Sequence, residues 1–158
     1  MKTRSFYSML TAALLGLALA VGFTGCGTPA QNLATANYLA GNAYATYELG
    51  KTAANLKGLQ DLAAALPGMA EGKVSPYQMG VINAELRAQQ ADVVDGKLKD
   101  QIGSLISAVS QAAAASNGGN PTINTAVITA ALTDAANGIQ HGIDFWKGQM
   151  SIKNPTSG

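Results

Sequence analysis

The sequence predicts an all-α fold, an elongated antiparallel bundle of about three long, alanine-rich helices. Apolar residues recur at helical spacing in three long segments, and such spacing gives each helix one face to bury. Residues 67–74 and 116–121 separate these segments and contain the Gly and Pro residues that favour turns. Alternation of apolar and polar residues is confined to residues 123–129, where a strand is the less favoured alternative.

The first predicted helix covers residues 32–66. This segment contains no proline and is rich in Ala and Leu. Its stripe of residues has a regular 4-3 spacing, which is the spacing of a heptad-like helix face. Pro67-Gly68 is expected to end the helix, because these residues disfavour further helical turns. The stripe consists of Tyr38, Asn42, Ala45, Leu49, Thr52, Leu56, Leu59, Ala63 and Leu66.

The second predicted helix begins at Ser75 and continues to about residue 115. Ser75 can cap the helix, Pro76 suits the first helical position, and Gln78 can complete a capping box. Asp95-Gly96 is a turn signal that could divide the segment into two helices. Because the stripe continues in phase across this pair, one continuous helix is favoured. The stripe consists of Met79, Ile82, Leu86, Gln90, Val94, Leu98, Ile102, Leu105, Val109 and Ala112.

The third predicted helix begins near Pro121 or Thr122. Gly138, Gly142 and Gly148 lower its helix propensity, and they would equally permit close contact with a neighbouring helix. An alanine-rich bundle buries little area per residue, so self-association is one way for it to gain stability. The stripe consists of Ile128, Leu132, Ala135, Ile139, Ile143, Trp146 and Met150.

The charge distribution excludes several classes of partner. Charged residues make up only 12% of the chain, and the formal net charge is +1. Lys2 and Arg4 lie in a segment expected to be removed, which leaves eight Lys/Arg against nine Asp/Glu. No run of like charge occurs, whereas binding to nucleic acid needs clustered Lys or Arg. We therefore expect no nucleic-acid partner, and no docking on anionic lipid through a basic patch.

The first 26 residues have the organisation of an export signal. Lys2 and Arg4 form a short positive region, and residues 9–23 are uncharged and mostly apolar. The apolar stretch is shorter than the roughly 20 residues that span a bilayer. Small residues then precede Cys26, the one cysteine of the chain. A single cysteine excludes an intrachain disulfide and a multi-thiolate metal site.

The tetrapeptide Phe23-Thr24-Gly25-Cys26 resembles the lipobox of bacterial lipoproteins, usually Leu-Ala/Ser-Gly/Ala-Cys. The resemblance implies cleavage before Cys26, a diacylglyceryl thioether on its sulfur, and often acylation of the new amino group. Phe23 departs from the usual Leu but keeps an apolar residue there. Gly27 follows the cysteine in place of Asp, which implies, by the sorting rule of diderm bacteria, an outer-membrane location facing the periplasm. The resemblance divides the chain into a signal peptide (1–25), a lipidated tether (26–31), a helical bundle domain (32–150) and a flexible tail (151–158).

Three other interpretations of this segment remain open. Ala18-Leu19-Ala20 fits the small-x-small pattern of ordinary signal cleavage, which would release a protein with a free Cys26 thiol. The segment could also be an uncleaved anchor, or Cys26 an incidental buried thiol. Lipidation has the largest physical consequence, because each buried methylene contributes ~0.8 kcal/mol and two or three chains give stable attachment.

No motif indicates catalysis, a metal or a cofactor. His141 and Asp144 are three residues apart and could share a helix face, but two ligands do not complete a zinc site. The serines lack the Gly-x-Ser-x-Gly setting of a hydrolase nucleophile. Five charged residues of alternating sign in the second helix are typical of an exposed face: Asp92, Asp95, Lys97, Lys99 and Asp100. We therefore expect a non-enzymatic protein.

The candidate interaction surface is aromatic and consists of Tyr38, Tyr44, Tyr47 and Trp146. Tyrosine can stack on a glycan or anchor a protein partner; alternatively, these residues, with Tyr77, cap one end of the bundle. We expect a membrane-anchored envelope lipoprotein that acts as a structural or protein-interaction module, with an envelope protein or a second copy as partner. The alternatives are a binding module for envelope glycan or a small apolar ligand, and a phage-derived lysis or exclusion lipoprotein.

Overall fold

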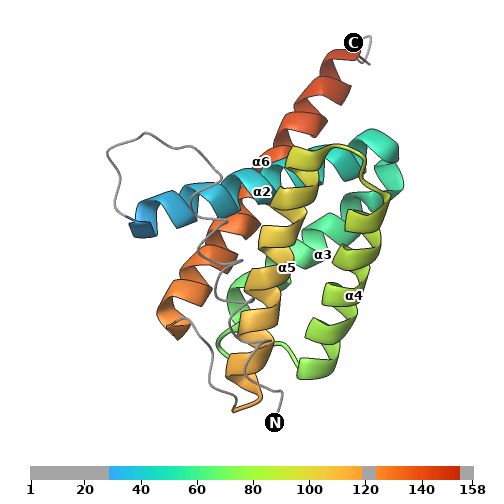
Figure 1. Cartoon of the computed structure of the whole chain (residues 1–158). Coiled ribbons are helices and arrows are strands. Elements are labelled where there is room, and N and C mark those ends of the chain that lie inside the picture. Colours follow the sequence, from blue (N-terminus) through green and yellow to red (C-terminus); the bar gives the residue numbers. More distant parts are fainter. Residues whose placement is uncertain (1–28, 119–123, 154–158) are drawn as a thin grey trace.

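The computed structural model describes residues 29–118 and 124–153, and its described residues are helical with no strand, which confirms the all-α fold (Figure 1). Within these residues five α-helices replace the three that were predicted, so that count is not confirmed. The predicted signal peptide and Cys26 lie outside the described residues. The elements are α2 (Pro29–Lys51), the 3-10 helix η1 (Ala53–Asn55), α3 (Leu56–Met69), α4 (Pro76–Asp92), α5 (Gly96–Ser116) and α6 (Thr125–Lys153).

The first predicted helix is divided at Thr52. This residue has extended backbone angles, φ −160° and ψ 140°, and its side-chain oxygen accepts a hydrogen bond from the Ala54 amide. A threonine that bonds a nearby backbone amide offers the chain an alternative to continuing the helix. The polypeptide therefore turns between α2 and α3, although the predicted stripe passes through Thr52 without a break in spacing.

The expected stop at Pro67-Gly68 is wrong by a few residues. α3 contains Pro67 and extends to Met69, because Leu66 and Met69 are both fully buried and their burial outweighs the backbone donor that proline lacks. Gly72 instead closes the helix with a positive φ of 73°. The Lys73 amide then donates to the Gly68 carbonyl (3.0 Å) and the Gly72 amide to that of Met69 (3.3 Å), the pattern of a Schellman motif.

The second predicted helix is divided at Asp95, so the prediction of continuity is wrong. Asp95 has φ −66° and ψ 117°, and its carboxylate accepts a hydrogen bond of 2.7 Å from the Leu98 amide, which caps α5. The break also shifts the apolar phase by one position, since Val93 is buried and Val94 is 98% exposed. At the other end of α4, the predicted capping box between Ser75 and Gln78 is present.

The third predicted helix forms as α6, and residues 125–129 are helical, not a strand. The first five stripe residues, from Ile128 to Ile143, are buried. α6 packs most extensively on α2, and the two helices meet at glycines. A Cβ atom at Gly41 would overlap the Ala135 carbonyl, and one at Gly138 would overlap the Tyr38 carbonyl. The predicted close contact is therefore confirmed for Gly138 and Gly142 but not for Gly148, where an added Cβ atom would meet nothing within 4 Å.

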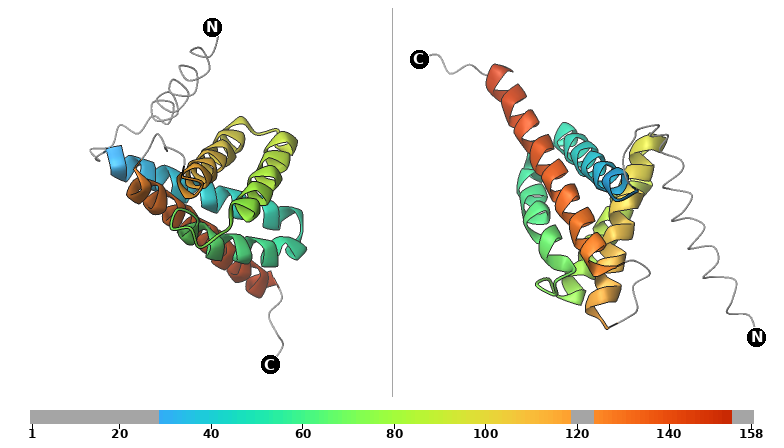
Figure 2. Two further views of the ribbon diagram at one scale, coloured as in Figure 1. Left: turned by 90° about the horizontal axis from the view of Figure 1, so that it is seen from below. Right: turned by 90° about the vertical axis from the view of Figure 1, so that its left-hand side faces the viewer.

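The α2–α6 pair runs in the same direction. In the left-hand view of Figure 2, α2 and α6 both run from left to right, and Gly142 lies against Ala45 whereas Gly138 lies against Tyr38. A purely antiparallel bundle is therefore not confirmed. The physical reason is that α2 and α6 are not consecutive: three intervening α-helices return the chain, which removes the reversal that a short loop imposes.

The remaining helices pack around this pair. α3 packs on α6, α5 packs on both α2 and α6, and α4 packs on α5; the right-hand view of Figure 2 shows α3 on one side of α6 and α5 on the other. None of the described helices has the length and apolar character of a membrane span. The largest fully buried side chains are Leu66, Met69, Met79, Leu86, Ile102, Leu105, Val109, Leu132, Ile139 and Ile143.

Candidate functional site

The packing order leaves a cleft between α3 and α4. α3 packs on α6 whereas α4 packs on α5, so the facing sides of α3 and α4 border an open volume of about 820 Å³. The carboxyl-terminal half of α2 forms the base of this cleft with Tyr44 and Glu48, which are 5% and 4% exposed. Residues from both walls include Leu62 and Ala65 of α3 and Tyr77, Val81, Ile82 and Glu85 of α4.

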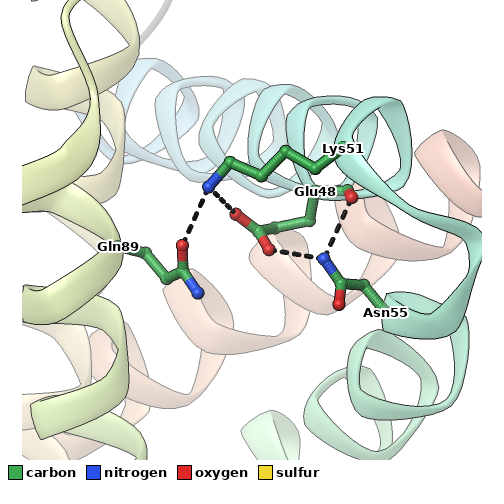
Figure 3. Close-up of polar contacts among 4 residues, drawn as sticks. All are labelled: Glu48, Lys51, Asn55 and Gln89. Atoms are coloured by element: carbon green, nitrogen blue, oxygen red, sulfur yellow. Dashed lines mark hydrogen bonds and ion pairs between the residues drawn. The ribbon is translucent and has the colours of Figure 1, made fainter.

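Glu48 is a buried carboxylate held by two partners from different segments (Figure 3). Its Oε1 lies 3.0 Å from Lys51 Nζ, and its Oε2 accepts a hydrogen bond of 2.8 Å from Asn55 Nδ2. Lys51 also donates to Gln89 Oε1 of α4 (3.0 Å). Because a buried charge is tolerated only when it is paired and hydrogen-bonded, this network holds the end of α2, the turn after it and α4 in one arrangement.

The ammonium group of Lys51 is favoured by this network. Partial desolvation disfavours its charged form, but the hydrogen bond to Glu48 and that residue's negative charge outweigh the loss and raise the pKa of Lys51. Lys51 Nζ also lies 4.1 Å from the centre of the Tyr47 ring, within the range of a cation–π interaction. The sequence does not indicate that Glu48 and Lys51 hold α2 and α4 together, because at this spacing they resemble an ordinary helical ion pair.

Tyr44 is the polar side chain at the base of the cleft that lacks a partner. Its hydroxyl makes no hydrogen bond with any residue in 29–118 or 124–153. Every fully enclosed side-chain nitrogen or oxygen in the described part of the chain does have a partner, so the Tyr44 hydroxyl must still open onto the cleft it lines. Burial, followed by the charges of Glu48 and Glu85, raises the pKa of Tyr44 well above its usual value, which keeps the hydroxyl protonated and able to donate.

We predict that Tyr44 makes the fold sensitive to alkali. Its folded-state pKa is raised above the ordinary 10.0, so the folded protein retains a proton that the unfolded chain releases. The associated stability is present below about pH 10 and is lost as the pH rises beyond it. Lys51 contributes in the same direction and range. Urea denaturation from pH 8 to 11 should show a steeper alkaline loss of unfolding free energy in the native chain than in Tyr44→Phe.

The control for this prediction is Tyr77→Phe. Tyr77 lines the same cleft but is 81% exposed, so its replacement should leave the alkaline slope of the native chain unchanged. If Tyr44→Phe and the native chain lose stability in parallel as the pH rises, Tyr44 is not the group whose pKa differs between the folded and unfolded protein.

The structure separates the predicted aromatic surface into four places. Tyr44 lines the cleft, and Tyr47 lies beneath Lys51. Tyr38 lies beside His141, with 6.0 Å between ring centres, and Trp146 packs against the core. Of the predicted aromatic residues, the cleft therefore contains Tyr44, joined there by Tyr77.

His141 and Asp144 are engaged with other neighbours. Asn42 Nδ2 lies 2.6 Å from His141 Nδ1, and Gln140 Nε2 donates to Asp144 Oδ1 at 2.9 Å. No group of three His, Cys, Asp or Glu side chains within the two described segments is placed to hold a metal ion.

The cleft combines apolar side chains on both walls with carboxylates and a buried hydroxyl, and it is therefore the candidate binding site. Cleft volumes of 300–1,000 Å³ are roughly those that enclose small molecules, and the value here lies within that range. Glu48, Asp61 and Glu85, which contribute its carboxylates, are not among the residues that the sequence predicts for a site. Comparison of the chain with protein-family models, with curated proteins and with solved structures finds no match.

Proposed function

We propose that this chain is a bacterial envelope lipoprotein, held at a membrane by acyl chains on Cys26, whose helical body is a non-enzymatic binding module. The single observation that supports binding is the cleft between α3 and α4, which combines a volume of about 820 Å³ with an unpaired hydroxyl at its base. Binding sites for small molecules have this composition, mostly apolar walls and a few placed polar groups. A small apolar ligand is therefore favoured over envelope glycan as its occupant.

The proposed anchor is close to the folded body. α2 begins at Pro29, and only Gly27 and Thr28 separate it from Cys26. The three residue steps from Cys26 to Pro29 span at most ~11 Å when extended, so lipid on Cys26 would hold the start of α2 close to the headgroups. Gly27 supports the outer membrane, facing the periplasm, as the location.

A protein-interaction module is the second candidate. Phe145 on α6 is 56% exposed and Val94 is 98% exposed, and another protein or a second copy that covered these side chains would remove apolar surface from water. Cross-linking of intact cells before membrane extraction tests this candidate, because a module of this kind would be captured with a defined neighbour.

The anchor is tested by the intact mass of the mature protein extracted from membranes. We expect a chain that begins at Cys26 and carries the added mass of two or three acyl chains, since that number gives stable attachment. Cys26→Ser should remain uncleaved at this site and carry no acyl mass, because the side chain that is modified is gone. Thr28→Ala, two residues further on, should behave as the native chain does.

Two results would contradict the anchor. One is a mature protein that begins at Val21, after Ala20, with an unmodified thiol. The other is a native product recovered entirely from the soluble fraction.

A further inference from the structure

The charges around the cleft are predominantly negative. Glu48, Asp61 and Glu85 line it together with a single ammonium group, that of Lys73. Lys73 is already paired with Glu71 at 2.6 Å, and Asp61 is paired with Lys57 at 2.6 Å. An anionic ligand would meet like charge here, and like charges at short range in a partly desolvated site are repulsive.

Glu85 is the carboxylate of the cleft that lacks a partner. The two oxygens of Glu48 are occupied by Lys51 and Asn55, whereas Glu85 forms no ion pair or hydrogen bond with the residues that the structure describes. Glu85 lines the same cleft as Tyr44, and its negative charge adds to the burial and the Glu48 charge that raise the pKa of Tyr44. The cleft therefore has an exposed, unpaired carboxylate on its α4 wall and an unpaired hydroxyl at its base.

Both walls also carry apolar side chains. Leu62 and Ala65 come from α3, and Val81 and Ile82 come from α4. Val81 is 49% exposed although it faces this space, so a ligand would remove apolar surface from water on binding. A ligand that pairs with the free carboxylate and also covers the apolar side chains needs a positively charged donor at one end and an apolar body.

We propose that the cleft binds a small amphipathic cation, a protonated amine carried on an apolar body. The ammonium group pairs with the Glu85 carboxylate and donates to the Tyr44 hydroxyl oxygen, and the apolar body packs between α3 and α4. The two observations that carry this are independent: the buried tyrosine whose hydroxyl opens unpaired onto the cleft, and the excess of carboxylate over ammonium around it. The inference rests on the proposal that the cleft is a binding site and names the chemistry of its ligand.

The test uses three probes of one shape that differ in charge: the phenethylammonium ion, 2-phenylethanol and 3-phenylpropionate. Each is titrated calorimetrically into the full-length chain reconstituted in lipid nanodiscs, with empty nanodiscs as the blank. We expect phenethylammonium to bind at least tenfold more tightly than the alcohol and the carboxylate to show no binding. Glu85→Gln should weaken phenethylammonium about tenfold, the loss of roughly one charge-assisted hydrogen bond.

Matched variants separate the site from general electrostatics. Asp92→Asn removes an exposed carboxylate from the same helix, outside the cleft lining, and should leave the affinity unchanged. Tyr44→Phe should weaken the ammonium several-fold and leave the alcohol within twofold. Equal affinity for all three probes overturns the cation preference while leaving a binding cleft intact. Absence of binding by every probe overturns both the cation preference and the proposal that the cleft is a binding site. An unmodified Cys26 would overturn the anchor alone.

Discussion

Replacement of Gly138 by alanine is expected to destabilise the fold by about 3 kcal/mol, the upper end of the usual cost of overpacking. A Cβ atom at this position would overlap the Tyr38 carbonyl oxygen and come within 2.9 Å of the Asn42 amide nitrogen. Both neighbours are backbone atoms of α2, which cannot rotate away as a side chain can. The α2–α6 pair, the most extensive helix contact in the described chain, would have to separate.

The control for Gly138→Ala lies ten residues further along the same helix. A Cβ atom at Gly148 would meet nothing within 4 Å, so Gly148→Ala should stabilise the protein by roughly 0.8–1 kcal/mol through helix propensity alone. Urea denaturation followed by circular dichroism measures both changes. A Gly138→Ala protein as stable as Gly148→Ala would show that α2 and α6 do not approach as closely as described.

Periodicity predicted where helices form, but it could not predict where they end. The stripes of α5 and α6 are buried largely as expected, from Ile102 to Ala112 and from Ile128 to Ile143. The two breaks depend on single side chains, Thr52 and Asp95, that bond a nearby amide. Such caps contribute about 1 kcal/mol each, which decides between a straight and a broken helix without changing the apolar spacing around them.

Helix direction and the cleft could not be predicted, because both depend on contacts distant in sequence. Gly138 is compatible with a close helix contact on residue type alone. The sequence around it does not indicate that α2 is the neighbour or that α2 and α6 run in the same direction. The sequence indicates Tyr44 as part of an interaction surface only because tyrosine is common at such surfaces. Its importance comes from Glu48 and Glu85, which resemble ordinary solvated carboxylates until α2, α3 and α4 are placed together.

The second large effect is expected at the network beneath the cleft, in the variant Lys51→Met. Methionine keeps an apolar stem against Tyr47 but removes the ammonium that pairs with Glu48. Breaking a fully buried pair costs roughly 3–5 kcal/mol because an uncompensated charge stays behind. The side chain of Lys51 is 37% exposed and that of Glu48 only 5%, so water screens part of the loss. We expect a destabilisation of about 2 kcal/mol.

The exposed ion pair of α3 provides the matched comparison. Lys57 and Asp61 lie 2.6 Å apart with side chains 82% and 66% exposed, and such i,i+4 pairs contribute only about 0.3–0.5 kcal/mol. Lys57→Met should therefore change the free energy of unfolding very little in the same urea denaturation. The double variant Lys51→Met with Glu48→Gln should recover part of the loss, because the amide retains the hydrogen bond to Asn55 without leaving a buried charge. Equal effects of Lys51→Met and Lys57→Met would mean that Glu48 is solvated, and that the base of the cleft is open to water from below.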